Sequence, residues 1–124
     1  MNIYGVVLVY FTDDCHAEIF LRLVANNCKE RHTDYWAAYY LLTCKHDIRV
    51  KTLEHIGRFI DWLGILNEDF SEEYQQFVQF AFIIFSNPAD ELPELVGGIH
   101  NEYREVITQA VKNRKNGMHP VPVR

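Results

Sequence analysis

The sequence predicts an all-α fold: a single-domain bundle of about five helices, with a short extended segment before the first one. Apolar residues recur at steps of three and four over most of the chain, which is the period of an amphipathic helix. Hydrophobic residues make up 48% of the chain, enough for a well-packed core. A length of 124 residues suits one core better than two, so residues 1–124 are assigned to one domain.

The N-terminal part predicts an extended segment and then a helix. Residues 1–11 are rich in Val and Tyr and predict an extended lead-in or one short strand, for which no partner strand is evident. Thr12 or Asp13 can cap a helix over residues 13–27, whose acidic first turn suits the helix dipole. The apolar face of this helix consists of Ile19, Phe20, Leu23 and Val24.

The second helix is predicted from a cap at Thr33 or Asp34 to about Thr43, and it is the densest aromatic segment of the chain. Tyr and Trp often supply the binding energy of protein–protein contacts, but they also fill cores. Both uses remain open, so the run is a candidate surface for docking a protein partner. The residues concerned are Tyr35, Trp36, Tyr39 and Tyr40.

The third helix is predicted to begin with Asp47 as its cap. Its apolar residues keep the helical period past Gly57 and as far as Leu63. Because glycine weakens a helix, either Gly57 introduces a kink or Gly64 ends the helix.

The fourth helix is predicted between a cap at Ser71 and a stop at Asn87 and Pro88. Apolar residues lie on all of its sides, so it is predicted to be the central and most buried helix. Acidic residues precede and begin it; they suit a helix N-terminus, and they also form a second candidate surface for a protein partner. These residues are Glu68, Asp69, Glu72 and Glu73.

The net charge of −5 is unevenly distributed, with −1 over residues 1–45, −7 over residues 46–100 and +3 over residues 101–124. The acidic middle repels a phosphate backbone, so nucleic-acid binding is disfavoured in general. The basic end contains a fifth predicted helix, after a loop over residues 89–98, and residues 117–124 are expected to form a flexible tail. The candidates for contact with DNA are Arg104, Lys112, Arg114 and Lys115.

The sequence predicts neither a membrane span nor a secretory signal. The longest apolar run, residues 77–85, is about half the length that a membrane span needs. No basic segment precedes the apolar opening of the chain, and no small-residue cleavage pattern follows it. An odd number of cysteines, three, favours reduced thiols and a cytoplasmic location.

Cysteine and histidine occur close together twice, as Cys28 with His32 and as Cys44 with His46. These residue types are zinc ligands, but a pair separated by one residue, such as Cys44 and His46, rarely binds one tetrahedral ion. A chain with this much apolar material also needs no metal to fold. A metal-binding protein or metalloenzyme, with His16 as a further ligand, is kept as an alternative, and no cofactor is predicted.

Three segments, FTDDCHAEIFLRL, DYWAAYYLLT and AFIIFSN, resemble a group of small uncharacterised proteins from Gram-positive bacteria and their phages. The resemblance implies an all-helical fold and a phage or mobile-element setting, but no active site. His16 is its one polar motif position and is expected to bond to a neighbouring helix. The matching positions are Phe11, His16, Phe20, Tyr35, Ala38, Leu41, Leu42, Thr43, Ala81, Phe82, Phe85 and Asn87.

The function predicted from these features is that of a non-enzymatic protein-binding module, which inhibits or modulates a host protein such as a defence complex. We expect a protein partner and no membrane, and a homodimer remains open. The alternatives are a metal-binding protein that uses the Cys and His residues, and a DNA-binding regulator that uses the basic C-terminal helix.

Overall fold

The computed structural model describes residues 2–4, 7–29, 31–87 and 101–116. Within these ranges the prediction of an all-α fold is confirmed, because α-helices and one 3₁₀ turn make up nearly all of the regular structure. The helical elements are α1 (Asp14–Asn26), α2 (Thr33–Leu42), α3 (His46–Thr52), the 3₁₀ turn η1 (Leu53–His55), α4 (Trp62–Leu66), α5 (Glu72–Ser86) and α6 (Asn101–Asn116). The predicted loop over residues 89–98 and the predicted tail over residues 117–124 lie outside the described residues.

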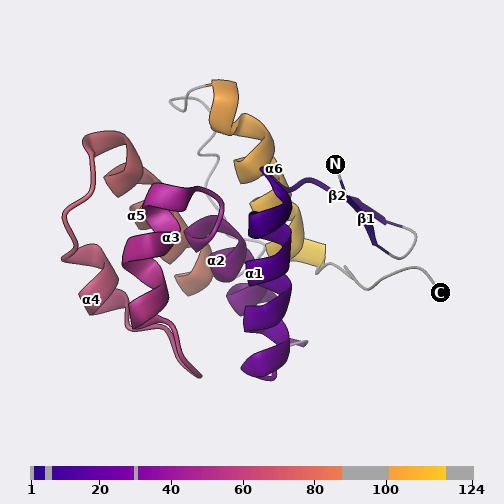
Figure 1. The fold of residues 1–124 in the computed structure, drawn as a ribbon, viewed down its shortest axis with the longest axis horizontal. Coiled ribbons are helices and arrows are strands. Elements are labelled where there is room, and N and C mark those ends of the chain that lie inside the picture. The colour runs from indigo at the N-terminus through magenta and orange to yellow at the C-terminus, as the bar shows by residue number, and fades with distance from the viewer. Residues whose placement is uncertain (1, 5–6, 30, 88–100, 117–124) are drawn as a thin grey trace.

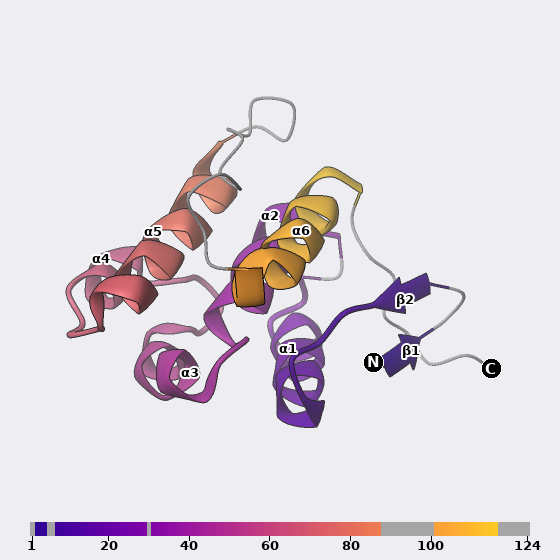
Figure 2. The same ribbon diagram turned by 90° about the horizontal axis from the view of Figure 1, so that it is seen from above.

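The N-terminal segment pairs with itself. Strands β1 (Asn2–Tyr4) and β2 (Val7–Val9) form an antiparallel pair in which Asn2 lies opposite Val9. The prediction of a single extended lead-in without a partner strand is therefore wrong, because the chain reverses and supplies its own partner. Both ribbon views place the two strands to one side of the helices, beyond α1 (Figures 1 and 2).

Helix α2 lies at the centre of the molecule (Figure 1). Every residue from Trp36 to Leu42 is at most 5% exposed. The helix packs most extensively against α5 and α6, and it also contacts α1 and α3. Ala37 and Ala38 are fully buried in this packing, and such small side chains allow neighbouring helices to approach closely.

Helix α5 covers one side of α2 and packs with another side against α4. Its cap is confirmed, because the Ser71 hydroxyl accepts a hydrogen bond of 3.3 Å from the Tyr74 N–H. The prediction that this helix is the most buried one is wrong, since Phe82 on α5 is 37% exposed while α2 is enclosed. A helix that is apolar on all sides usually packs against several neighbours, but part of the apolar side of α5 faces solvent.

Helix α1 begins at a side-chain cap and ends at a residue in the left-handed conformation. Asp13 is the N-cap, and its carboxylate accepts a hydrogen bond of 2.7 Å from the His16 N–H. At the other end Cys28 has φ of +56°, the N–H of Cys28 donates to the Ala25 carbonyl and the N–H of Lys29 donates to the Val24 carbonyl. This is the Schellman arrangement, in which glycine is the usual residue at the left-handed position.

The single helix predicted from Asp47 to Leu63 is wrong. Helix α3 stops at Thr52, the 3₁₀ turn η1 follows, and a short bridge joins Ile56 to Ile60 before α4 begins. Asp61 starts the new helix, because its carboxylate accepts a hydrogen bond of 3.1 Å from the Gly64 N–H.

Two other predicted caps are also wrong. Lys45, and not Asp47, is the N-cap of α3, and His32, and not Thr33 or Asp34, is the N-cap of α2. Neither Lys45 nor His32 makes a side-chain capping bond. Both helices therefore start where tertiary packing places them, without a local capping bond.

No helix among the described residues is both long enough and apolar enough to pass through a bilayer.

Candidate functional site

The aromatic run on α2 belongs to the core. Trp36 is 5% exposed, and Tyr39 and Tyr40 are fully buried, so the prediction that they form a docking surface is wrong for these three. The Trp36 indole N–H donates to the Lys29 carbonyl, and the Tyr40 hydroxyl donates to the Tyr10 carbonyl. Tyr35, at the exposed end of the run, is half-buried and is the member of the set that reaches the surface.

His16 is a structural residue, as expected from its place in the first turn of α1. Its Nε2 lies 2.8 Å from the Tyr40 carbonyl, and its Nδ1 accepts a hydrogen bond of 3.1 Å from the Thr12 N–H. These partners fix the neutral tautomer with the proton on Nε2. Burial lowers the pKa of His16 from 6.5 to about 4, so the ring stays neutral at physiological pH.

The predicted cysteine and histidine ligands are not brought together. Cys44 is fully buried, and burial raises the pKa of its thiol to about 12, which makes it a poor nucleophile and ligand. Cys28, His32 and His46 are exposed. The one group within the described ranges whose donor atoms are close enough for a metal ion contains none of these four residues.

The basic residues of α6 divide into two kinds. Arg114 is engaged inside the fold, where its guanidinium donates to the Ile84 carbonyl at 3.1 Å and to the Asn87 carbonyl at 2.8 Å. It also donates to the Thr33 hydroxyl at 3.3 Å. Arg114 therefore closes the C-terminal end of α5 and is not open to a phosphate. Lys115 is exposed at the end of the helix.

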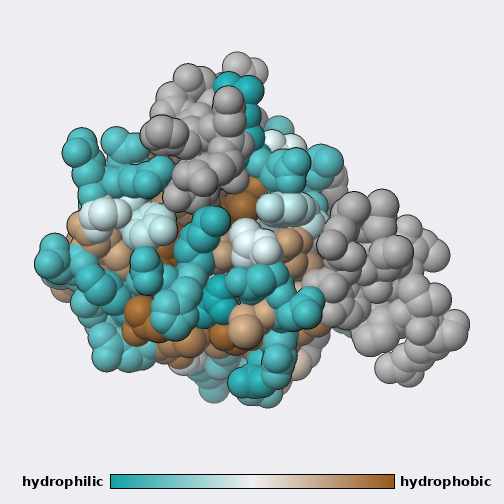
Figure 3. Space-filling model, turned by 45° about the horizontal axis from the view of Figure 1, so that its top comes forward, coloured by the Kyte–Doolittle hydropathy of each residue, from teal (hydrophilic) through white to brown (hydrophobic). Residues whose placement is uncertain are grey.

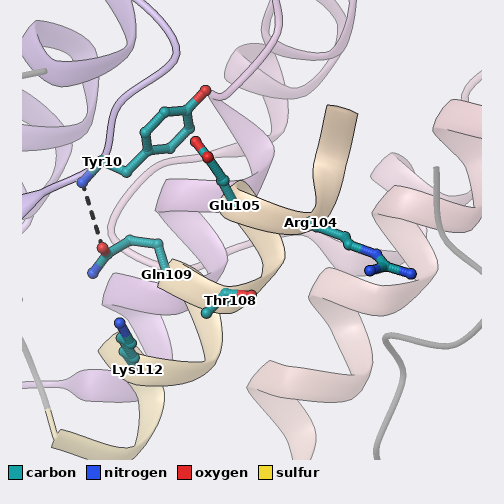
Figure 4. A pocket seen from close by; sticks show the side chains of 6 residues that line it. All are labelled: Tyr10, Arg104, Glu105, Thr108, Gln109 and Lys112. Atoms are coloured by element: carbon teal, nitrogen blue, oxygen red, sulfur yellow. Dashed lines mark hydrogen bonds between the residues drawn. The ribbon is translucent and has the colours of Figure 1, made fainter. Parts of the chain in front are cut away.

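The other two basic residues, Arg104 and Lys112, line a shallow pocket of about 360 Å³ between α6 and the segment before α1 (Figure 4). On one side of this pocket, the Tyr10 N–H donates a hydrogen bond of 3.4 Å to the Gln109 amide oxygen. Figure 4 shows the Arg104 side chain directed away from Tyr10 and Gln109. Of the four predicted basic residues, Arg104, Lys112 and Lys115 are exposed and only Arg114 is engaged inside the fold, so the contact with DNA stays a prediction.

A different set of apolar residues reaches the surface around α4. Phe59 and Leu63 are 68% and 74% exposed, and Phe82 on α5 is 37% exposed. Trp62, a half-buried residue next to Leu63 in the chain, lies 5.3 Å from Phe82 between ring centroids. We call this set the apolar surface; it consists of Tyr35, Phe59, Trp62, Leu63, Phe82 and Phe85.

Ring contacts make the apolar surface continuous from α4 to α2. Trp62 lies 5.3 Å from Phe85, and Phe85 lies 5.0 Å from Tyr35. The Lys29 ammonium sits 4.0 Å above the Tyr35 ring and 5.0 Å from the Phe59 ring, so its charge is held against two aromatic faces. On the face drawn in Figure 3, hydrophobic patches likewise lie between hydrophilic side chains.

Acidic residues follow the apolar residues of α4 along the chain. Of the four predicted acidic residues, Asp69 and Glu72 are exposed, Glu73 is half-buried, and Glu68 is bonded to His55. The Lys51 ammonium donates to the backbone carbonyl of Asp69. The predicted acidic surface is therefore present as exposed carboxylates, with Glu68 already engaged.

His55 is surrounded by carboxylates. Its Nε2 lies 2.7 Å from Glu68 Oε2 and 3.5 Å from Glu54 Oε1, and its Nδ1 lies 3.5 Å from Asp61 Oδ2. The hydrogen bond to Glu68, with help from the other two carboxylates, raises the pKa of His55 above its usual value of 6.5. No sequence pattern predicted this cluster, because the one continuous helix predicted over residues 48–63 would have separated these side chains.

Comparisons with protein families, with characterised proteins and with solved structures found no match to this chain.

Proposed function

We propose that the chain is a non-enzymatic protein-binding module whose apolar surface docks a basic, amphipathic segment of a partner protein. The observation that carries this proposal is the exposure of Phe59 and Leu63, at 68% and 74%. Burying one such side chain is worth about 1.5–3 kcal/mol, so a partner that covers both gains a substantial part of its binding energy there.

The charges near the apolar surface favour a basic partner. Between η1 and the first turn of α5 the chain carries six carboxylates, which outnumber the three cations of this region, Lys29, Lys51 and Arg58. Opposite charges at the rim of an interface raise the association rate and select among partners, while the apolar centre supplies affinity. The acidic residues are Glu54, Asp61, Glu68, Asp69, Glu72 and Glu73.

The interior of the fold offers further support for binding in place of catalysis. His16 is buried with both ring nitrogens bonded, and the Cys44 thiol is buried with its pKa raised to about 12. Neither group is open to a substrate. The resemblance to small phage proteins supports a host protein, such as a component of a defence complex, as the source of the docked segment.

A pair of model peptides tests this proposal. The full chain is titrated with a helical peptide of about 18 residues that carries Leu on one face and Lys on the other, and with a second peptide that has the same Leu face but Glu in place of Lys. Binding is followed by calorimetry. We expect the Leu/Lys peptide to bind and the Leu/Glu peptide to bind at least about tenfold more weakly.

Variants separate apolar docking from simple charge attraction. The double variant Phe59→Ser with Leu63→Ser is expected to weaken binding of the Leu/Lys peptide by at least about tenfold, because it removes the exposed apolar contacts. Val50→Ser is the matched control, since Val50 is 54% exposed on α3 and lies outside the apolar surface. Equal binding by the double variant and the wild type, or equal binding of the two peptides, would overturn the proposal.

A further inference from the structure

We infer that Glu54, His55 and Glu68 form a binding site for a divalent transition-metal ion such as Zn²⁺, with Asp61 orienting the histidine. The inference is independent of the apolar surface, because it rests on the donor atoms grouped around η1 and the end of α4. One ligand atom from each of the three residues lies within 4.8 Å of the others. They come from two places in the chain, 13 residues apart between His55 and Glu68, and the loop before α4 brings them together.

The spacing of the donor atoms is close to that of a coordinated set. In a tetrahedral site with bonds of about 2.0–2.2 Å, neighbouring ligand atoms lie roughly 3.4 Å apart. His55 Nε2 and Glu54 Oε1 are 3.5 Å apart, which already fits. His55 Nε2 and Glu68 Oε2 are 2.7 Å apart, so the Glu68 carboxylate must withdraw by roughly 0.7 Å when an ion enters. The carboxylate is bonded at one oxygen to an accessible imidazole, so this adjustment needs no change in the backbone.

Asp61 faces the other ring nitrogen of His55. Metal-binding histidines usually donate their second N–H to a carboxylate or carbonyl, which fixes the tautomer and the ring orientation. Asp61 Oδ2 lies 3.5 Å from His55 Nδ1, while Oδ1 of the same carboxylate is fixed by the Gly64 N–H. His55 therefore presents Nε2 to Glu54 and Glu68 with its Nδ1 facing a positioned carboxylate.

The imidazole of His55 and the carboxylate of Asp61 fit beside α4 because residue 64 is a glycine. A Cβ at position 64 would lie 2.5 Å from Asp61 Oδ2 and 2.5 Å from His55 Nδ1. Real Cβ atoms do not approach other heavy atoms this closely, so any larger residue would displace the imidazole or the carboxylate. The site thus depends on a specific backbone position as well as on the four side chains.

The charge and chemistry of the donors indicate the class of ion. Three carboxylates surround one imidazole, so even a protonated His55 leaves an excess of negative charge, which the nearby Lys51 only partly offsets. A divalent cation neutralises that excess. The imidazole nitrogen favours Zn²⁺, Co²⁺ or Ni²⁺ over Mg²⁺ and Ca²⁺, which take oxygen ligands almost exclusively.

Titration with Zn²⁺ alone and with Co²⁺ alone tests the site, using the full chain without a histidine tag near neutral pH. We expect one ion per chain by calorimetry, and visible absorption typical of tetrahedral Co²⁺. His55→Ala should remove the Co²⁺ spectrum and weaken binding by at least about a hundredfold, because it deletes the nitrogen ligand. His46→Ala is the matched control, since it removes an exposed histidine that lies next to Asp47 but outside the cluster.

Two variants at positions that orient His55 should change the affinity for the ion without a comparable change in stability. Asp61→Asn keeps a good helix cap for α4 but changes the partner of His55 Nδ1, so it should weaken binding by about 10–100-fold with little change in the thermal melting temperature. Gly64→Ala should weaken binding by a similar factor through displacement of the imidazole. The inference fails if no ion binds at millimolar concentration, if His55→Ala binds like the wild type, or if His46→Ala loses binding instead. None of these outcomes affects the peptide test of the apolar surface.

Discussion

Acidification should destabilise the fold through His16, and the size of the effect follows from the geometry of this residue. The pKa of His16 is 6.5 in the unfolded chain and about 4 in the folded one. The unfolded chain therefore takes up a proton as the pH falls through 6.5, whereas the folded chain resists protonation until about pH 4. The stabilisation is complete above pH 6.5 and is lost as the pH falls from 6.5 to 4. It amounts to about 3 kcal/mol, since each pH unit is worth about 1.4 kcal/mol.

The physical cause is the surroundings of the ring. A proton on Nδ1 would face the Thr12 N–H, which is itself a donor, and would put a charge between the rings of Phe11 and Tyr40 at centroid distances of 5.1 and 4.6 Å. The buried guanidinium of Arg49 opposes that charge as well. The carboxylate of Asp13 attracts it, but burial outweighs the attraction.

The assay is urea unfolding followed by circular dichroism at several pH values between 7 and 4, for the wild type and for His16→Gln. The variant lacks the titrating ring, so other ionisable groups cancel in the difference between the two proteins. The wild type should be the more stable of the two at pH 7, by about 1–3 kcal/mol for the lost hydrogen bonds, and this advantage should shrink by about 3 kcal/mol toward pH 4. A difference that stays constant over this range would refute the reasoning, because it would mean that His16 titrates alike in both states.

Two further predictions concern helix ends. Cys28→Gly should stabilise the fold by about 1 kcal/mol, because φ of +56° strains any residue with a Cβ. The measurement is the melting temperature, which should rise; a fall would show that contacts of the Cys28 side chain are worth more than the strain. Arg114→Met should lower the free energy of unfolding in urea by about 2 kcal/mol, because the carbonyls of Ile84 and Asn87 lose their donor. Lys115→Met, the control, should change the free energy of unfolding by less than about 0.5 kcal/mol. Equal effects of the two variants would show that the hydrogen bonds of Arg114 do not stabilise the end of α5.

Local chemistry made some features predictable. Ser71 was predicted as a cap, and Asp13 was one of two predicted candidates, because a short polar side chain before an apolar helical pattern can accept a hydrogen bond from the first turn. His16 was expected to bond to a neighbouring helix, and it does so at the Tyr40 carbonyl. Such features depend on residues close in sequence or on a simple count of donors and acceptors.

The rest depended on tertiary context. The period from Ile48 to Leu63 continues across Gly57, yet the chain turns there because the bridge between Ile56 and Ile60 and the new cap at Asp61 compete with the helix. That turn is also what exposes Phe59, so the same error hid the apolar surface. Periodicity records which residues are apolar, but it does not record how many neighbours a helix will have.

The aromatic run on α2 is a second feature whose burial could not be predicted from the sequence. Tyr39 and Tyr40 carry polar groups that suggest a surface, but both are fully buried. Tyr40 packs against Phe11, His16 and Phe20, while α5 and α6 cover other sides of α2. The sequence separation between α2 and these helices is long, and nothing local indicates the contact. Surface and core uses of tyrosine could therefore be separated only by the structure.

The position of α2 has a consequence for how the protein is made. Its cover comes from α5 and α6, which leave the ribosome well after α2 has been synthesised. Until then the side chains from Trp36 to Leu42 have no partner on those sides and remain open to aggregation. The nascent chain consequently reaches its stable state only when Asn101–Asn116 is present, and a chain truncated before α6 would be a substrate for chaperones and proteases.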